Sequence, residues 1–274
     1  MTSNPALLHV RRSYLNRRRV ERTLKFAALV LLLAFGVWTL EALRIPISRV
    51  LGMFGRIGDM IVNRLLPPDL SYVASYEVSI AVVETIEMSL LGAFVGTLIC
   101  IPVAWWSAWN VTPNRRTYYV VGRGILVFAR SVPTLIWGML LVVLLGFGPA
   151  AGSIALMMLT IGFAGKLMAE QVEAIDMGPV EAIRATGASE LEVFAYAIYP
   201  QVKPAWVGII IYNWDSVFRA STILGFVGAG GLGIYLRMTI QVLEYEQAAG
   251  IIALVIVLVI LSELLSHHVR SWYQ

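Results

Sequence analysis

The chain has 274 residues, of which 58% are hydrophobic and 14% charged, and its formal net charge is +4. A soluble domain averages about 25% charged residues, so this composition excludes an ordinary soluble protein and indicates a polytopic membrane protein. The lone cysteine, Cys100, excludes a disulfide framework and a cysteine metal cluster. The histidines, His9, His267 and His268, lie outside the hydrophobic segments, which argues against an intramembrane enzyme that needs a histidine.

The first predicted element is a transmembrane helix over Phe26–Leu43, which follows a basic segment, residues 1–25. About 20 apolar residues suffice to cross a bilayer core of about 30 Å. A secretory signal peptide is the alternative, but the apolar stretch is too long and lacks a small-residue cleavage site. Basic residues beside a first span orient it in the membrane, and a nucleic-acid-binding arm is the weaker interpretation of them.

Residues 44–78 predict an external helix that lies along the membrane surface and forms one region, 26–78, with the first span. Its apolar residues recur near helical spacing, which is typical of an amphipathic interfacial helix. They are Ile47, Val50, Leu51, Phe54, Ile57, Ile61 and Leu65. Pro67-Pro68 is expected to end this helix, because proline cannot donate the next backbone hydrogen bond.

A core of further spans is predicted over residues 79–268, beginning with a span from about Ser79 to Trp109. The stretch from Ser131 to Gly165 carries no charge and is too long for one span. Gly146-Phe147-Gly148-Pro149 divides it, because glycine favours turns and proline suits the first turn of a new helix. The remaining spans are therefore expected at about 124–146, 149–168, 204–226 and 247–265, before a tail at 269–274.

Lysine and arginine set the expected orientation, since cytoplasmic segments carry their excess. With the N-terminus inside, most basic residues fall in the N-terminal segment, the loop after the second span, the loop at 169–203 and the C-terminal tail. The outer side then carries only Arg44, Arg49, Arg56, Arg64 and Arg237. The sequence thus predicts an all-α protein of about six transmembrane helices, with both termini in the cytoplasm.

The loop at 169–203, between the fourth and fifth spans, is polar and acidic and predicts two short helices on the cytoplasmic side. Gly178-Pro179 is expected to start the first helix, with Pro179 at its first position and Glu181 in its first turn, where a carboxylate meets the positive end of the helix dipole. Gly187 is placed to end this helix with a positive φ.

The second short helix of the loop is predicted to begin at Ser189-Glu190-Leu191-Glu192, a sequence typical of a capping box. Pro200 is expected to stop it. The result would be a rigid helix–glycine–helix unit suited to a groove on a partner protein. An ordinary helical hairpin that merely joins two spans would have the same pattern, so the physics alone leaves both interpretations open.

The loop resembles the EAA loop of ABC importer permeases, in which Glu-Ala-Ala, three residues, glycine and a later hydrophobic-x-Leu-Pro form the unit presented to a cytoplasmic ATPase. The chain matches this pattern at Glu181, Ala182, Gly187 and Pro200. It departs from it at Ile183, Ala197 and Tyr199, which roughly keep the size and apolar character. The resemblance implies ATPase coupling through Pro179, Glu181, Ala182, Ile183, Ala185, Gly187 and Pro200.

Other segments resemble the phosphonate-type permeases, whose relatives handle phosphonate, phosphite and hypophosphite. These segments are Leu66–Asp69, Arg130–Thr134, Glu173–Ala188 and Arg219–Gly233, and the resemblance covers about residues 65–274. It implies a permease subunit for such an oxyanion. Methionine importer permeases share the glycine-rich ending at Gly228–Gly233, so a methionine or other small-solute importer is the alternative within this class.

The resemblance also implies the fold and the location of the chain: a type I ABC importer permease fold in the bacterial inner membrane. The expected partners are a periplasmic binding protein, a cytoplasmic ATPase dimer that uses ATP and Mg²⁺, a second permease subunit and membrane lipid, but no nucleic acid. The chain itself lacks a Walker A motif, since Gly162–Leu167 has neither its spacing nor its Ser/Thr, so no cofactor or metal is expected in it. A non-transporting membrane scaffold and an intramembrane enzyme are the rivals from other classes.

Two arginines, Arg130 and Arg219, fall within predicted spans, where a central charge costs roughly 2.5–3.5 kcal/mol on insertion scales. Together with Ser131, Asp215 and Ser221 they are expected to line an anion path, because guanidinium groups bind phosphorus oxyanions bidentately. The competing interpretation pairs Arg219 with Asp215, one helical turn earlier. Arg130, expected near the cytoplasmic end of its span, could instead extend its side chain to the interface.

Overall fold

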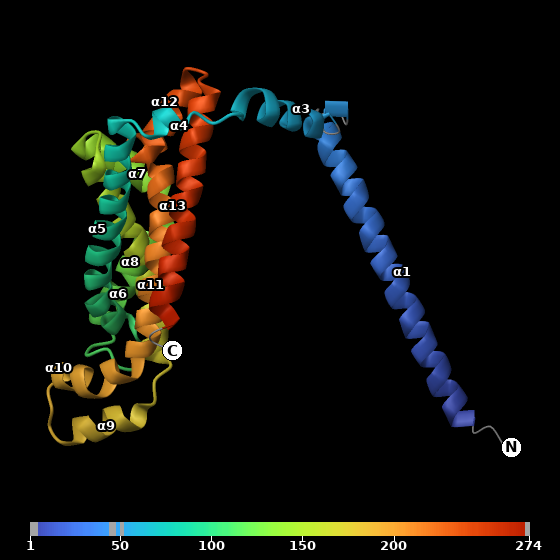
Figure 1. Ribbon diagram of the computed structural model, residues 1–274. Helices are drawn as coiled ribbons and strands as arrows, with labels where there is room; N and C mark the ends of the chain where they lie inside the picture. The colour runs from blue at the N-terminus through green and yellow to red at the C-terminus, as the bar shows by residue number, and fades with distance from the viewer. Residues whose placement is uncertain (1–4, 44–47, 50–51, 272–274) are drawn as a thin grey trace. The chain divides into compact units, whose positions relative to one another are not determined.

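The computed structural model describes residues 5–43, 48–49 and 52–271, and among these residues there are helices and turns but no β-strand. The expected all-α class is therefore confirmed. The chain divides into two units, Met1–Asn63 and Arg64–Gln274. Figure 1 shows the long helices of both units.

The first unit contains α1, Pro5–Ala42, and α3, Met53–Met60. α3 continues into a π-turn, η1, Ile61–Leu65, whose last two residues belong to the second unit. The part of α1 from Glu21 to Ala42 is long and apolar enough to cross a membrane, in agreement with the predicted first span. The expected helix after this span is present in α3 and η1 and ends ahead of Pro67-Pro68. Ile47, Val50 and Leu51, which the sequence placed on its apolar face, lie outside the described residues.

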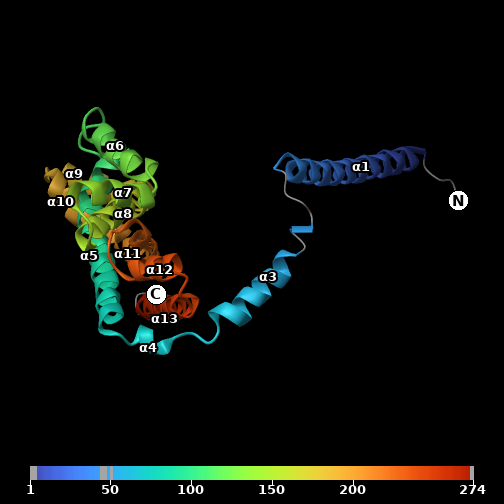
Figure 2. The ribbon, with the colours of Figure 1, turned by 90° about the horizontal axis from the view of Figure 1, so that it is seen from above.

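The second unit is a bundle of long helices. α5 packs on α8, α8 on α11 and α11 on α13 (Figure 2). These helices comprise α5, Tyr76–Ser107; α8, Pro149–Glu173; α11, Tyr199–Leu224; and α13, Tyr245–Ser271. The short α4, Leu70–Val73, leads into α5, and α12, Leu232–Gln241, packs on α13. The core of the bundle is apolar, with Met88, Leu156 and Met168 fully buried.

α5 and α8 pack closely along the bundle, and glycines of α5 face α8. A Cβ added at Gly92 would lie 2.5 Å from the Cβ of Leu156, and one at Gly96 would lie 2.6 Å from the Cβ of Thr160. Real Cβ atoms do not approach this closely, so only glycine fits at these positions. Small residues let two helix backbones approach, which is a common way to join helices in membranes.

The number of spans depends on two bent helix pairs. Among the described residues, four helices are long and apolar enough to span a membrane by themselves, and up to six spans result if each bent pair forms one span. One pair is α6, Tyr118–Ser131, with α7, Thr134–Leu145, which meet at 91°. The other joins Glu190–Val227 to α12 at 44°.

The third span was predicted as one helix over about 124–146, and the bend at Val132-Pro133 was missed. Pro133 disfavours the helical conformation for the residue before it, and Val132 is extended at φ −105°, ψ 123°. The predicted break further along is confirmed: α7 ends at Leu145, and Pro149 is the first residue of α8.

Candidate functional site

The loop between α8 and α11 folds into two short helices, which we call the α9–α10 hairpin, residues 176–198 (Figure 1). α9 runs from Met177 to Ala185. Its N-cap is Asp176, whose carboxylate accepts a hydrogen bond from the Gly178 N–H at 3.0 Å. The prediction that Pro179 opens this helix and Glu181 lies in its first turn is wrong, because capping by Asp176 starts the helix two residues earlier.

The corner of the hairpin has the predicted glycine geometry. Gly187 has φ +82°, and its N–H donates to the Arg184 carbonyl at 3.0 Å. This left-handed conformation costs little for glycine and roughly 1–2 kcal/mol for most other residues. Gly187 therefore sets the angle at which the chain leaves α9.

The second helix of the hairpin begins with the predicted capping box. α10, Glu190–Val193, has the Ser189 hydroxyl facing the Glu192 N–H, while the Glu192 carboxylate accepts from the Ser189 N–H at 2.7 Å. The Ser189 hydroxyl and backbone N–H both favour the charged form of this carboxyl and lower the pKa of Glu192. Arg184 and Glu190 add a salt bridge of 2.9 Å across the corner.

Pro200 does not stop the second helix, contrary to the prediction. The chain continues from α10 through a π-turn, η2, Phe194–Ile198, into α11. Pro200 is the second residue of α11 and lies directly after the wider π-turn, a local irregularity that accommodates the proline ring. The hairpin is thus joined without a break to the long helix α11.

One face of the hairpin is buried and the other is exposed. Val180, Val193 and Ile198 are fully buried and belong to the same apolar cluster as Met168 of α8 and Trp206 of α11. The residues predicted to contact the ATPase are exposed except Ile183, which packs half-buried against this cluster. The exposed ones are Pro179, Glu181, Ala182, Ala185, Gly187 and Pro200.

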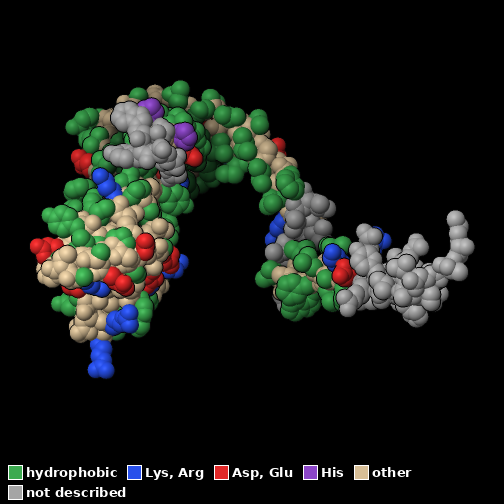
Figure 3. Space-filling model, turned by 90° about the horizontal axis from the view of Figure 1, so that it is seen from below, with side chains coloured by type: hydrophobic (Ala, Val, Ile, Leu, Met, Phe, Trp, Pro, Cys, Tyr) green, Lys and Arg blue, Asp and Glu red, His purple; other side chains and the backbone are tan. Residues whose placement is uncertain are grey.

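Two large side chains that the sequence analysis did not assign also lie on the outer surface of the hairpin. Leu191 is 69% exposed and Tyr196 is 73% exposed. Acidic and basic side chains gather at this end of the second unit (Figure 3). Exposed apolar side chains on a rigid support, ringed by charges, are typical of a protein-binding surface.

The base of the hairpin is fixed by two amides that the sequence analysis missed. The Gln201 side chain binds the N–H and the carbonyl of Asp176 at 3.0 and 3.2 Å. The Asn110 Nδ2 donates to the Val172 carbonyl at 3.0 Å and to the Glu173 carbonyl at 3.4 Å. Their partners are 25 to 63 residues away in the chain, so no local pattern could have revealed these bonds.

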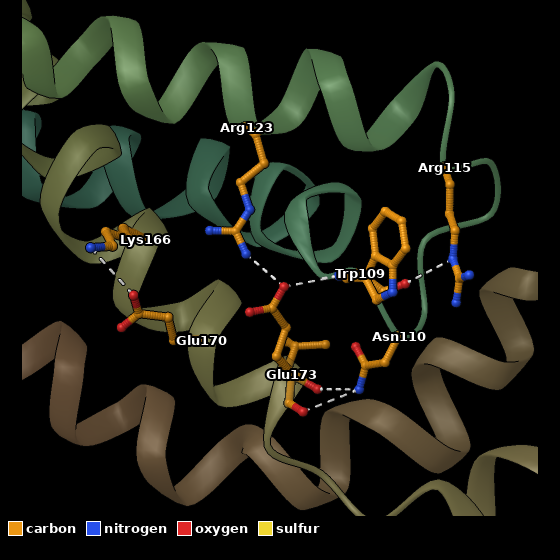
Figure 4. Close-up of polar contacts among 8 residues, drawn as sticks. Trp109, Asn110, Arg115, Arg123, Lys166, Glu170 and Glu173 are labelled. Carbon is orange, nitrogen blue, oxygen red and sulfur yellow. Dashed lines mark hydrogen bonds and ion pairs between the residues drawn. The ribbon is translucent and has the colours of Figure 1, made fainter.

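Glu173, at the end of α8, joins this base to α6 (Figure 4). Its Oε1 accepts from the Arg123 guanidinium at 2.6 Å and from the Trp109 N–H at 3.0 Å. Arg115 lies on the other side of the loop and donates to the Trp109 carbonyl at 3.3 Å (Figure 4). The turn between α5 and α6 is therefore tied to the point where the hairpin leaves α8.

The residues predicted for an anion path lie on two elements. Arg219 pairs with Asp215 on α11, as the competing interpretation expected. Ser221 is fully buried and donates to the Phe218 carbonyl of its own helix.

The other two predicted path residues, Arg130 and Ser131, end α6 and line a pocket beside α8. Arg130 was expected near the cytoplasmic end of its span, but the structure places it elsewhere. Its backbone is 3.0 Å from a Cβ built on Gly162, in the middle of α8, because the bend at Pro133 places the end of α6 there.

The chain matches the model of one protein family, described as binding-protein-dependent transport system inner membrane component, over residues 100–273. It is 35% identical to the phosphite transport system permease protein PtxC of Stutzerimonas stutzeri over 78% of this chain and 77% of that protein. It is 32% identical to the putative phosphite transport system permease protein HtxC of the same organism, over 96% and 90%. A probable D-methionine transport system permease protein of Haemophilus influenzae is 25% identical over 57% and 78%.

A solved structure has the same fold over most of this chain. A chain of the inward-facing MetNI methionine ABC transporter superposes with a TM-score of 0.61 at 22% identity, covering 72% of this chain and 96% of that one. The expected type I importer permease fold is therefore confirmed.

Proposed function

Because the chain belongs to the family of binding-protein-dependent transport system inner membrane components, we propose that it is the permease subunit of an ATP-driven importer for phosphite, phosphonate or a hypophosphite-like oxyanion. As a member of this family it is a multi-pass membrane transport subunit and not an enzyme. A periplasmic binding protein delivers the oxyanion, and a separate ATPase dimer supplies the energy with ATP and Mg²⁺.

The observation that carries the coupling proposal is the α9–α10 hairpin. Its inner face belongs to the apolar core, and its end continues into α11. A force applied to the exposed Glu181, Ala182 and Ala185 is therefore transmitted to α8 and α11 through the buried face of the hairpin and its continuation into α11. We assign the exposed face of the hairpin, with Leu191 and Tyr196, to contact with the ATPase.

The choice of a phosphorus oxyanion over methionine rests on the relatives. The phosphite permeases are 35% and 32% identical over 78% and 96% of this chain, whereas the methionine permeases are 25–30% identical over only 44–57% of it. Guanidinium groups match the oxygens of such anions bidentately. Arg130 with Ser131, and Arg219 with Asp215 and Ser221, are the groups that we propose for the anion path.

We further propose that the subunit lies in the bacterial inner membrane with both termini in the cytoplasm. The basic N-terminal segment favours this orientation, because cytoplasmic segments carry the excess of lysine and arginine. The hairpin then faces the cytoplasm, on the side of the ATPase. A second permease subunit, identical or paralogous, completes the pore.

Uptake by cells tests the proposed substrate. A bacterial strain from which the gene for this chain is deleted receives either the wild-type gene or an empty vector, and the uptake of labelled phosphite, methylphosphonate and methionine is measured. The wild-type gene is expected to restore uptake of a phosphorus compound and to leave methionine uptake unchanged. Restoration of methionine uptake alone would replace the substrate and keep the permease.

A further inference from the structure

A cationic pocket between α6 and α8 remains unexplained by ATPase coupling. Its volume is about 310 Å³, and half of its lining side chains carry a positive charge. The lining residues are Arg123, Leu126, Val127, Arg130 and Ser131 from α6 and Lys166 from α8. It extends from the bend at the end of α6 toward Arg123, which binds the end of α8 (Figure 4).

The charges of the pocket do not cancel. Arg123 is paired with Glu173 at 2.6 Å, and Lys166 with Glu170 at 3.4 Å. Arg130 has no carboxylate within salt-bridge distance among the described residues, so one net positive charge remains at the end of the pocket near the bend. A charge in a membrane-spanning segment is costly, and such residues usually pair or face a solute path.

The pocket also contains hydrogen-bond donors that have no acceptor in the part of the chain that the structure describes. The guanidinium of Arg130 is exposed, and no hydrogen bond or salt bridge of the described residues uses its N–H groups. The Ser131 hydroxyl has already donated its hydrogen to the Val127 carbonyl at 2.7 Å. The unused donors of the pocket therefore belong to its cations, which is the pattern expected for binding an anion rather than a neutral or cationic ligand.

We infer that this pocket binds a phosphorus oxyanion, with or without an apolar substituent. Arg130 and Arg123 offer planar guanidinium donors that match two oxygens at once, and Lys166 adds a point charge. Leu126 and Val127 form an apolar wall for the substituent. Two sources share this chemistry: the transported phosphite or phosphonate, and the headgroup of an anionic phospholipid, which basic pockets between helices also bind.

The two carboxylates beside the pocket make the inference sharply testable, because they compete with the ligand for the cations. Removing the charge of Glu170 frees Lys166 and should strengthen binding. Removing the charge of Arg130 should weaken binding about tenfold, equivalent to ~1.4 kcal/mol. Arg115 lies outside the pocket and is the matched control, since it offers the same guanidinium group in the loop that precedes α6.

The test uses the purified full chain in nanodiscs of zwitterionic lipid. Equilibrium binding of labelled phosphite and methylphosphonate is measured in one arm, and phosphatidylglycerol retained in native mass spectrometry in the other. We expect at least one probe to bind the wild type, to bind Arg130→Gln and Lys166→Gln about tenfold more weakly, to bind Glu170→Gln more tightly and to bind Arg115→Gln unchanged. Arg130→Lys, which keeps the charge, should retain part of the affinity and guards against a folding defect.

The outcomes separate the two sources. Binding of the free anions identifies a solute site, whose role in transport rests on the proposed function, and retention of phosphatidylglycerol alone identifies a lipid site. If no probe distinguishes the wild type from Arg130→Gln, the inference is overturned. The assay needs neither ATPase nor binding protein, so its failure leaves the import proposal standing, and a failure of import leaves a positive binding result standing.

Discussion

Gln201 binds the backbone of Asp176 with both atoms of its side-chain amide. Its Oε1 accepts a hydrogen bond from the Asp176 N–H at 3.0 Å, and its Nε2 donates to the Asp176 carbonyl at 3.2 Å. Asp176 caps α9, and Gln201 lies in the first turn of α11. The start of the hairpin is therefore attached directly to the helix into which the hairpin continues.

Replacing Gln201 by methionine, which has a similar length but no amide, should uncouple the ATPase. If the two bonds contribute about 1 kcal/mol each, solute-stimulated ATP hydrolysis should fall roughly ten- to thirtyfold. The measurement is ATPase activity of the reconstituted complex with loaded binding protein. The exposed Gln241 at the end of α12 provides the control Gln241→Met. Equal activity of both variants would remove Gln201 from the coupling route.

Alanine at Gly187 should alter the hairpin corner while leaving membrane insertion intact. Its φ of +82° disfavours any Cβ by roughly 1–2 kcal/mol, although there is open space around it. We expect solute-stimulated ATP hydrolysis to drop several-fold at an unchanged yield of folded protein. Gly208→Ala, also in open space but inside helix α11, is the matched control and should behave as the wild type. Full stimulation in Gly187→Ala would show that the angle of the corner does not matter.

The Arg219–Asp215 pair on α11 allows structural and transport roles to be separated. The Asp215 side chain is only 11% exposed, so Arg219→Ala leaves a largely buried charge without its partner, which typically costs about 3–5 kcal/mol when one partner is removed. The double variant Asp215→Asn/Arg219→Gln should regain most of the thermal stability but not the uptake of phosphite. Normal uptake by the double variant would mean that Arg219 serves the fold alone.

The contact between α5 and α8 predicts a strong difference between two glycines. Gly92→Ala would bring its Cβ within 2.5 Å of Leu156, whereas Gly124 on α6 has no neighbour within 4 Å. Overpacking of this kind costs typically about 1–3 kcal/mol. Thermal unfolding in detergent should therefore start several degrees lower in Gly92→Ala than in Gly124→Ala. Identical unfolding curves would contradict the described packing.

Features with a local cause were predictable from the sequence. The positive φ at Gly187, the capping box at Ser189 and the helix break before Pro149 each depend on neighbours within a few residues, and the structure has all three. Proline was harder to interpret. Pro133 bends a span that was expected to be straight, and Pro200 lies within a continuous helical stretch that it was expected to end.

Long-range polar contacts could not be predicted. The bonds of Glu173 to Arg123 and of Asn110 to the end of α8 connect residues 50 to 63 positions apart. Hydrophobic periodicity identifies which face of a helix is buried but not which helix covers it. The cationic pocket was missed for the same reason, since Lys166 and Arg130 line one pocket only after α6 packs on α8.

Reconstituted transport tests the proposed function most directly. Proteoliposomes with this chain and its ATPase are loaded with ATP and Mg²⁺, the binding protein is added outside, and the accumulation of labelled phosphite, methylphosphonate and methionine is followed. We expect ATP-dependent accumulation of a phosphorus oxyanion and none of methionine. Accumulation of methionine alone, or none that depends on ATP, would contradict the proposed function.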